Sequence, residues 1–386
     1  IKKTGIIFIL GQAAGGISGF LLQFSMSLAS PALVNSLQGV QYIFLFFFGI
    51  FLKEKYTKLA VITKFIGIIF IALGLYVLTT KEQNKAQIGI TYSPRYAIAL
   101  NLDPRVTFQK ILNDFNFKYI RLPVYWDEVE TFPMEINFSN VDYYINEAAK
   151  RNVQIILTLG YKQPRWPECF DPPWVKNLIR SERDLKILKL VKVEIEHFKK
   201  FENIIAWQIE NEPFLTWGNC DNPNKQTQKR VAREIEIVRN SDSRSIILTD
   251  SGELGLWTKA INQADIFGTT LYRSIWDPYF GVVHYPFPPI FYTLKSDLTH
   301  LITNKKNSTI ISELQMEPWI RDQKGTARSD IPTQIKDFPI SRLAENLKHA
   351  KETNFSQIYL WGVEWWYFMA KNGHPEYLKK AKQLFK

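Results

Sequence analysis

The sequence predicts an α/β protein, a (β/α)8 TIM barrel preceded by three transmembrane α-helices. Two observations lead to this expectation. The first eighty of the 386 residues contain three long apolar runs, whereas the remainder alternates short β-rich runs with amphipathic helical stretches. We therefore expect a three-helix membrane segment over residues 1–80, a short polar linker over 81–86 and a barrel domain over 87–386.

Composition excludes several classes of protein. The chain is 46% hydrophobic and 14% aromatic, which is too apolar for a disordered chain. Its two cysteines exclude a disulfide-dense scaffold and a cysteine-rich zinc module. The net charge of +11 comes without an Arg/Lys stripe or a nucleic-acid motif, so we expect no nucleic-acid partner.

The three apolar runs have the length of membrane spans. Each contains about 20 residues, enough for a helix to cross a ~30 Å hydrocarbon core. They cover Gly5–Leu28, Ala32–Leu52 and Leu59–Leu78, and none carries a charge at its centre. A cleaved signal peptide is the alternative for the first run, but it does not predict two further spans.

Lysines indicate the orientation of these spans. Lys2 and Lys3 precede the first run, and Lys53–Lys58 joins the second to the third. With three spans, both lysine-rich segments lie on the same side, which the positive-inside rule places in the cytoplasm. We therefore expect a multi-pass membrane protein whose barrel domain is extracytoplasmic.

Eight short β-rich runs follow residue 86. We expect strands at Gln87–Tyr92, Tyr119–Val124, Gln154–Leu159, Ile204–Glu210, Ser245–Thr249, Ile266–Leu271, Thr309–Glu313 and Gln357–Trp361. We expect helices at Thr107–Phe115, Val141–Arg151, Leu185–Phe201, Thr227–Asn240, Ile340–Thr353 and Pro375–Phe385. Strands that alternate with helices imply a parallel sheet, and eight of them fit a closed barrel. A doubly wound open sheet is the alternative, but no Gly-rich phosphate loop follows the first strand.

Carboxylates stand at the ends of two expected strands, where barrels carry their chemistry. Glu210 and Glu212 end the fourth strand and Glu313 ends the seventh, across the barrel. Cleavage of a glycosidic bond needs such a pair, one to protonate the leaving oxygen and one to attack the anomeric carbon or activate water. Glu210 and Glu212 both qualify as the acid, because alternate residues of an extended strand point the same way. Glu212 is favoured as the acid because it lies nearer the rim of the barrel. The alternative role for Glu210 is a structural ion pair with a base such as Arg121.

These motifs resemble those of clan-A glycoside hydrolases, which include family 5 cellulases and mannanases and the family 42 and 35 β-galactosidases. Asn211-Glu212-Pro213 resembles their acid/base motif, and Ile311-Ser312-Glu313 resembles their nucleophile strand. The resemblance implies that Arg121 braces the nucleophile, Asn211 contacts the sugar 2-hydroxyl, Tyr272 lies near the nucleophile and Trp361 floors the sugar subsite.

The chain departs from the family 5 pattern at two places. The third strand ends in Gly160-Tyr161, where many members carry histidine. Thr270 stands two residues before Tyr272, at another position that the resemblance would give to histidine. These departures leave the sugar and the linkage open.

Tryptophan is absent from residues 1–80 and common in the expected strand–helix loops. Flat apolar sugar faces stack on such rings, whereas loop packing is the alternative for part of the set. The loop candidates are Trp126, Trp166, Trp174, Trp217, Trp276, Trp319, Trp365 and Trp366. Of these, Trp166 and Trp319 are our candidates for substrate binding.

A few other polar residues are weaker candidates. The five histidines form no metal-spaced pair, so no metal site is expected, and only His284 is placed to line the cleft. Asp250 and Glu253 follow the fifth strand, where we favour surface exposure. Cys169 and Cys220 lie in loops after adjacent strands and form either a disulfide or two free thiols.

Residues 1–80 resemble the C-terminal end of an EamA-type drug/metabolite transporter, on Ser30–Tyr42 and Gly67–Val77. Such transporters have many more spans, so transport by this chain alone is not expected. The combined expectation is a membrane-tethered retaining glycoside hydrolase that cleaves β-linked glycans with two glutamates and no cofactor. Its partners are an oligo- or polysaccharide substrate and the lipid bilayer; the oligomeric state is open. The alternatives are an inactive glycan-binding barrel and an accessory domain of a membrane transporter; a transglycosylase would share the covalent intermediate.

Overall fold

The structure is a computed structural model that describes residues 86–216, 218–221, 224–277, 279–319 and 330–385. The three spans expected within residues 1–80, and most of the 81–86 linker, lie outside the described residues. Among the helices that the structure does describe, none combines the length and apolarity needed to cross a bilayer.

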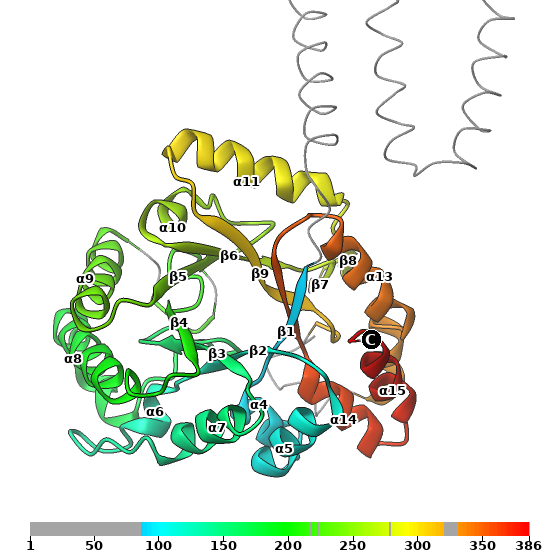
Figure 1. Cartoon of the computed structure of the whole chain (residues 1–386), viewed down its shortest axis with the longest axis horizontal. Coiled ribbons are helices and arrows are strands. Elements are labelled where there is room, and N and C mark those ends of the chain that lie inside the picture. Colours follow the sequence, from blue (N-terminus) through cyan, green and yellow to red (C-terminus); the bar gives the residue numbers. More distant parts are fainter. Residues whose placement is uncertain (1–85, 217, 222–223, 278, 320–329, 386) are drawn as a thin grey trace, which may run out of the picture. The chain divides into compact units, whose positions relative to one another are not determined.

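Eight parallel strands close into a barrel (Figure 1). They are β1 (Gln87–Thr91), β2 (Tyr119–Pro123), β3 (Gln154–Leu159), β4 (Ile204–Ile209), β5 (Ser245–Asp250), β6 (Ile266–Leu271), β9 (Ser308–Gln315) and β10 (Gln357–Trp361). The order around the barrel is β1-β10-β9-β6-β5-β4-β3-β2, and pairing of β1 with β10 closes the ring. The predicted barrel is therefore confirmed, and each expected strand ends within two residues of an observed one.

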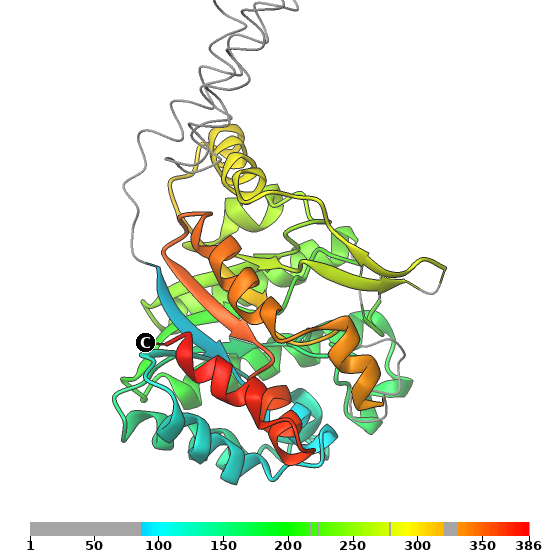
Figure 2. The ribbon, with the colours of Figure 1, turned by 90° about the vertical axis from the view of Figure 1, so that its right-hand side faces the viewer.

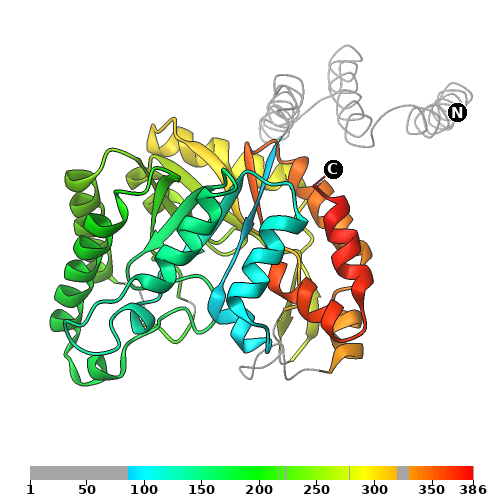
Figure 3. The same ribbon diagram turned by 60° about the horizontal axis from the view of Figure 1, so that its bottom comes forward.

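Helices surround the strands, as the tilted view shows (Figure 3). The longer ones are α5 (Pro104–Asp114), α7 (Ser139–Ala149), α8 (Arg180–Phe198), α9 (Lys225–Ser241), α11 (Pro289–Thr303), α13 (Ser341–Lys351), α14 (Val363–Lys371) and α15 (Pro375–Gln383). The shorter ones are α4 (Pro94–Ala99), α6 (Trp126–Val129), η1 (Pro173–Asn177), α10 (Thr258–Gln263) and α12 (Ile331–Asp337). The six helices named from the sequence overlap α5, α7, α8, α9, α13 and α15, whereas α11, α14 and the short helices were not among those named.

Side-chain caps fix where two of these helices begin. Asp103 precedes α5 and its Oδ1 accepts a hydrogen bond from the Val106 amide at 2.8 Å. Asn224 precedes α9 and accepts from the amides of Gln226 and Thr227. Each cap satisfies amide donors that a helix start leaves without a partner, so the strand–helix junctions are defined locally.

A small hairpin interrupts the strand–helix alternation after β6. Its strands, β7 (Ser274–Asp277) and β8 (Gly281–His284), pair antiparallel outside the barrel. Figure 2 shows the hairpin extending away from the barrel strands. The eight-unit scheme did not include this insertion, which brings Ile275 and Trp276 to the cavity described below.

The inside of the barrel changes from apolar to polar along the strands. Near the amino ends, a separate cluster of buried side chains fills the interior: Tyr119, Ile156, Ala206, Ile247, Ile310 and Tyr359. Two residues further along, the same faces of β2, β3, β4 and β5 present Arg121, Thr158, Gln208 and Thr249, all fully buried. The apolar layer therefore closes the bottom, and the polar layer is the floor of the functional site.

A disulfide joins the loops after β3 and β4. Cys169 and Cys220 are bonded, with their Cα atoms 5.4 Å apart. Of the two possibilities left open by the sequence, the structure therefore has the bonded pair. The bond crosslinks positions 51 residues apart, so it restricts the unfolded chain.

Replacing both Cys169 and Cys220 with serine should lower the free energy of unfolding by about 2–5 kcal/mol. Tryptophan fluorescence during urea unfolding measures this in the full chain, because all 11 tryptophans lie beyond residue 80. Wild-type protein treated with a reductant is the matched control and should unfold with the variant. Coincident curves for oxidised wild type and the variant would contradict the bond's contribution.

Candidate active site

A β-bulge in β9 turns Glu313 toward the inside of the barrel. Ile311 and Leu314 both pack in the core outside the barrel, although regular alternation would place them on opposite faces. The register with β6 shifts at the same point, where Thr270 pairs with Glu313 and its predecessor pairs with Ile311. Ser312 is therefore the extra residue of the bulge, and bulges commonly re-aim a side chain beside a functional site.

Two side chains hold the Glu313 carboxylate. Arg121 Nη1 donates to Oε1 at 2.9 Å, and the Tyr272 hydroxyl donates to Oε2 at 3.0 Å. Burial, and then the charge of Glu313, raise the pKa of Tyr272 well above its ordinary value. The phenol therefore keeps its proton for this bond, and the guanidinium adds a charge-assisted one that fixes the carboxylate plane.

Arg121 makes two further hydrogen bonds across the barrel floor. Its Nε donates to Gln208 Oε1 and its Nη2 donates to Asn211 Oδ1, both at 2.7 Å. Arg121 is fully buried, so protein groups replace the water that the guanidinium loses on folding. One side chain on β2 thus fixes the end of β4 relative to the carboxylate on β9.

The chain leaves β4 through two left-handed residues. The φ angle is +54° at Glu210 and +45° at Glu212, a region that residues other than glycine seldom adopt. The expectation that both side chains point the same way is therefore wrong, because it assumed an extended strand. Glu210 turns to α9 behind the barrel, whereas Glu212 lines the cavity.

The backbone of Glu212 is held on both sides. Its amide donates to Thr249 Oγ1 at 2.8 Å, and its carbonyl accepts from Lys162 Nζ at 3.1 Å. Its buried carboxylate oxygen Oε1 has no hydrogen-bond partner among the described residues. Burial, and then the charges of Glu313 and Glu168, raise the pKa of Glu212 well above the ordinary glutamate value. This environment favours a protonated carboxyl group.

Glu212 and Glu313 line one cavity of about 390 Å³. The other carboxylates in its lining are Glu168, Glu253 and Glu317. Its aromatic side chains are Trp166, Tyr272, Trp276, Tyr285, Trp319 and Trp361. Arg121 and Asn211 are not part of the lining; Arg121 contacts Glu313 and Asn211 from beneath the cavity. Among the described residues, no group of histidine, cysteine, aspartate and glutamate side chains is arranged to hold a metal ion.

A family model matches this part of the sequence. Residues 88–283, just over half of the chain, match the model "Cellulase (glycosyl hydrolase family 5)". The chain belongs to glycosyl hydrolase family 5. Members of this family are retaining O-glycosidases, so the protein is a glycoside hydrolase.

Among the solved structures that resemble this chain are proteins of two bacteria, Bifidobacterium longum and Streptomyces cattleya. The GH5_18 protein of Bifidobacterium longum has 11% identity, with 72% of this chain and 69% of that chain covered at a TM-score of 0.51. Its complex with Manb1-4GlcNAc has 10% identity over 72% and 68%, at 0.50. GH5_18 of Streptomyces cattleya, in complex with GlcNAc, has 9% identity over 72% and 70%, at 0.49. At these identities the likeness to the solved structures shows the fold alone. No curated protein matches the sequence.

Several aromatic candidates of this family 5 hydrolase belong to its core rather than to the cavity. Trp126, Trp365 and Trp366 are fully buried, and the indole of Trp366 donates to the Met316 carbonyl at 2.9 Å. These residues lie in the first turns of α6 and α14, which point the rings inward. The assignment of strands and loops along the sequence does not reveal that direction. Trp174 packs edge-on against Trp126 and is not part of the lining. Trp217 lies outside the described residues.

Three polar predictions also need correction. His284 ends β8 as an exposed residue and does not line the cavity. Asp250 is buried, not exposed, and accepts from the amides of Ser251 and Trp257. Glu253 lines the cavity, where it accepts from the Tyr292 hydroxyl at 2.6 Å and the Tyr272 amide at 3.1 Å.

The loop between β3 and α8 supplies site residues that the sequence did not reveal. Lys162 pairs with Glu168 at 3.0 Å while also holding the backbone at Glu212. Arg165 pairs with Glu317 and lines the cavity. One signal in the sequence could have pointed to these residues: charged side chains are dense beside Cys169, in a loop predicted to face the site. The sequence does not show which of them point inward.

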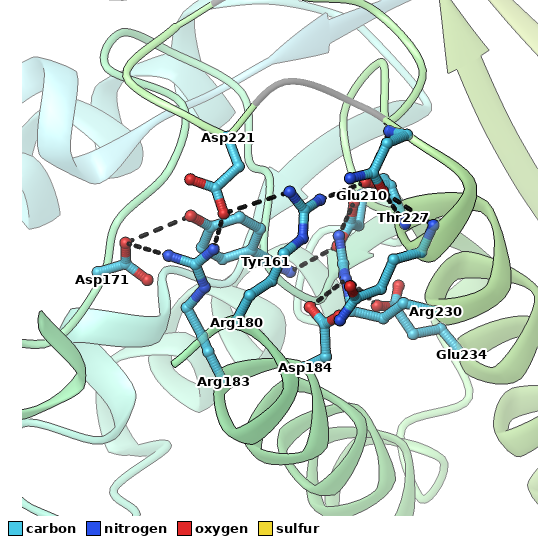
Figure 4. Close-up of polar contacts among 12 residues, drawn as sticks. Tyr161, Asp171, Arg180, Arg183, Asp184, Glu210, Asp221, Thr227, Arg230 and Glu234 are labelled. Carbon is cyan, nitrogen blue, oxygen red and sulfur yellow. Dashed lines mark hydrogen bonds and ion pairs between the residues drawn. The ribbon is translucent and has the colours of Figure 1, made fainter. Parts of the chain in front are cut away.

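Glu210 belongs to a buried charge cluster behind the site (Figure 4). Arg230 on α9 pairs with Glu210, Glu234 and Asp184, the last at 3.2 Å. The partner of Glu210 is thus Arg230, not Arg121 as the sequence suggested. Glu210 also accepts from the Tyr161 amide at 3.3 Å, so the ends of β3 and β4 are fixed together against α8 and α9.

The cluster continues outward beside the disulfide. Figure 4 shows Arg183 between Asp171, two residues after Cys169, and Asp221, directly after Cys220. The loops bearing Lys162 and Glu212 are therefore anchored by the disulfide outside and by Arg230 inside.

Substituting Arg230 with methionine should destabilise the protein by about 3–5 kcal/mol, because it leaves buried carboxylates without a cation. The loss should shrink as the pH falls below about 8: burial and then the charge of Glu210 raise the pKa of Glu234 to about 8, and protonation relieves the repulsion. Urea unfolding across a pH series measures both effects.

Arg239→Met on the same helix is the matched control. Arg239 pairs with Asp265 at the surface with 48% of its side chain exposed, so its loss should change stability by about 1 kcal/mol or less. Equal losses for both variants would contradict the structural role of the buried cluster.

Proposed function

We propose that this family 5 enzyme cleaves β-glycosidic bonds with Glu212 as acid/base and Glu313 as nucleophile. The supporting observation is that two carboxylates with opposite surroundings share one cavity. Arg121 and Tyr272 hold both oxygens of Glu313, whereas Oε1 of Glu212 has no hydrogen-bond partner among the described residues and the pKa of Glu212 is raised. These are the surroundings that an anionic nucleophile and a proton donor need.

In the first step, the Glu313 carboxylate attacks the anomeric carbon as the bond to the leaving oxygen breaks. The proton of Glu212 passes to that oxygen, so the aglycone departs as an alcohol. The sugar remains as a glycosyl ester of Glu313, and Glu212 becomes a carboxylate. Positive charge that develops on the sugar ring lies in a cavity rich in carboxylates.

In the second step, Glu212 takes a proton from water as the water oxygen attacks the anomeric carbon. The ester bond to Glu313 breaks, which restores both carboxyl groups and releases a sugar with its original configuration. A sugar hydroxyl in place of water would give transglycosylation by the same route.

The substrate is proposed to be a β-linked oligo- or polysaccharide. Trp166, Trp319 and Trp361 offer apolar ring faces beside polar groups, the combination that sugars require. Asn211 is proposed to contact the sugar hydroxyl next to the anomeric carbon, since it lies between Arg121 and the acid residue.

We further propose that residues 1–80 tether the hydrolase to a membrane as three spans of EamA-transporter-like sequence, with the barrel outside the cytoplasm. The support is the length of the three apolar runs and the placement of their lysines. A disulfide between Cys169 and Cys220 is consistent with an oxidising location.

Glu212→Gln should lower kcat by roughly 100- to 10,000-fold, and Glu313→Gln on the order of 10,000-fold or more. The assay uses the full chain in mild detergent with aryl β-glycosides and β-linked oligosaccharides. Para-nitrophenyl substrates should suffer less in Glu212→Gln, because their leaving group needs little protonation. Wild-type activity should fall as the pH rises through the raised pKa of Glu212, since the acid must be protonated.

Glu236→Gln, an exposed change on α9, is the control and should keep full activity. Unchanged turnover in Glu212→Gln and Glu313→Gln would refute the assignment. Oligosaccharide binding without turnover by the wild type would instead identify a glycan-binding barrel.

The tethering proposal predicts that the full chain stays in the membrane fraction after an alkaline carbonate wash. Protease added outside intact spheroplasts should digest the barrel and spare a tag placed before Lys2. Release by the wash would contradict the three spans, and a protected barrel would contradict the orientation.

A further inference from the structure

The cavity is closed at one end by a cluster around Arg165. We call this cluster the Arg165 wall; it consists of Arg165, Glu317, Glu364, Tyr96 and Trp361. Arg165 pairs with Glu317 and, at 2.9 Å, with Glu364. Its guanidinium carbon lies 3.7 Å from the ring centre of Tyr96 and 4.0 Å from that of Trp361. Arg165 is only 5% exposed, so the guanidinium is part of the packed interior.

The wall is connected to five strand–helix junctions. Tyr96 and Ser93 follow β1, Tyr125 follows β2, Arg165 follows β3, Glu317 follows β9, and Glu364 follows β10. The Ser93 amide donates to Glu364, and the hydroxyls of Ser93 and Tyr125 lie 2.7 Å apart. The Tyr125 hydroxyl also donates to the carbonyl of Pro164, next to Arg165, at 2.9 Å. Moving the guanidinium would therefore disrupt several buried polar contacts together.

The opposite end of the cavity has a different character. Its lining there comes from the segments after β4, β5 and β6 and includes Leu215, Leu254, Ile275 and Trp276. These side chains are partly or largely exposed; Leu254 is 60% exposed. At the wall, Arg165, Glu317 and Trp361 line the cavity, whereas Tyr96 and Glu364 lie behind them; among the described residues, the lining has no member from the segments after β1 and β2. A glycan chain thus has room to extend at the β5–β6 end and none at the Arg165 end.

We propose that the Arg165 wall makes this site exo-acting, with room for a single sugar between the wall and Glu313. The inference rests on the proposed function and adds to it that the enzyme cleaves at the end of the glycan chain rather than within it. The sugar bonded to Glu313 lies at the closed end, because Glu313 stands on β9, next to the strand β10 that carries Trp361 of the wall. The acid Glu212 follows β4, next to β5 at the open end, so the leaving group lies on that side. The terminal non-reducing sugar is therefore the one released, and the rest of the chain leaves through the open end.

Chromogenic substrates with one or two sugars test this directly. Para-nitrophenyl β-monosides and the matching β-biosides of glucose, mannose, galactose and xylose are assayed with the full chain in mild detergent. Direct release of nitrophenol from a bioside needs two sugars on the closed side of Glu313. We expect the monoside to exceed the bioside in direct release by about 100-fold or more, since a second ring would have to displace a buried ion pair. Biosides should first lose their terminal sugar, with nitrophenol following after a lag.

The outcomes separate the two proposals. Direct release from biosides that equals or exceeds release from monosides would overturn exo action while upholding the hydrolase. Direct release of nitrophenol from biosides, with no turnover of monosides, would do the same. No turnover of any substrate would remove the proposed function, and the inference with it.

Variants of the wall supply a second readout. Arg165→Ala should raise direct release from the bioside relative to the monoside by about tenfold or more, because the guanidinium no longer fills the space beside Trp361. Tyr96→Ala, which keeps both ion pairs, should shift the ratio the same way if Arg165→Ala fails to fold. Arg105→Ala removes a similar guanidinium–tyrosine stack, 4.4 Å from Tyr143, and should leave the ratio unchanged. An unchanged ratio in every folded wall variant would show that the wall does not limit the number of sugars that bind between it and Glu313.

Discussion

The site depends on one fully buried guanidinium. Arg121 loses all contact with water, so its donors need acceptors inside the barrel, and Gln208, Asn211 and Glu313 provide them. These acceptors come from two different parts of the sheet, which means that the strands must keep their register for the cation to be satisfied. The bulge at Ser312 serves the same requirement, because without it the Glu313 carboxylate would face outward.

The acid side of the site is built by loops rather than by strands. Glu210 and Glu212 both depart from extended backbone, and Thr249 and Lys162 hold Glu212 by its main chain. Among the described residues, no charged group is paired with the carboxyl group of Glu212. Lys162 can hold the main chain because Glu168 fixes its position. The disulfide and the Arg230 cluster stabilise the same two loops from outside, so the precision of the acid depends on contacts remote from the cavity.

The sequence predicted the strands well and the site in part. Eight strands with helices between them follow from periodicity, and the ends of β4 and β9 bring Glu212 and Glu313 to one cavity. Positive φ angles at Glu210 and Glu212 were not foreseeable, because no glycine signals them. The partner of Glu210 was missed for a related reason: Arg230 lies on a helix 20 residues later, and periodicity does not show which helix face meets a loop.

Other misjudgements follow from burial. Trp365 and Trp366 look like loop aromatics in the sequence but begin α14, whose first turns pack into the core. Arg165 drew no prediction from the sequence, because Tyr96 and Trp361 enclose it only in the folded barrel. In both cases tertiary packing decides the environment, and only the assembled barrel shows it.

The buried arginines pair with different numbers of carboxylates. This difference gives the buried acids different electrostatic surroundings and therefore different roles. Arg230 faces Glu210, Glu234 and Asp184, and Arg165 faces Glu317 and Glu364. The excess negative charge is relieved by protonation: burial and neighbouring charges raise the pKa of Glu234 to about 8, and burial raises that of Glu364 to about 7.

Glu313 differs, because among the described residues it is the carboxylate that pairs with Arg121. Glu212 has no cation paired with its carboxyl group among those residues, and it feels the charges of Glu313 and Glu168. The barrel therefore distributes few cations among many buried acids, so that one carboxylate is matched by a cation and the acid beside it is not. That difference is the electrostatic condition for one group to attack while the other delivers a proton.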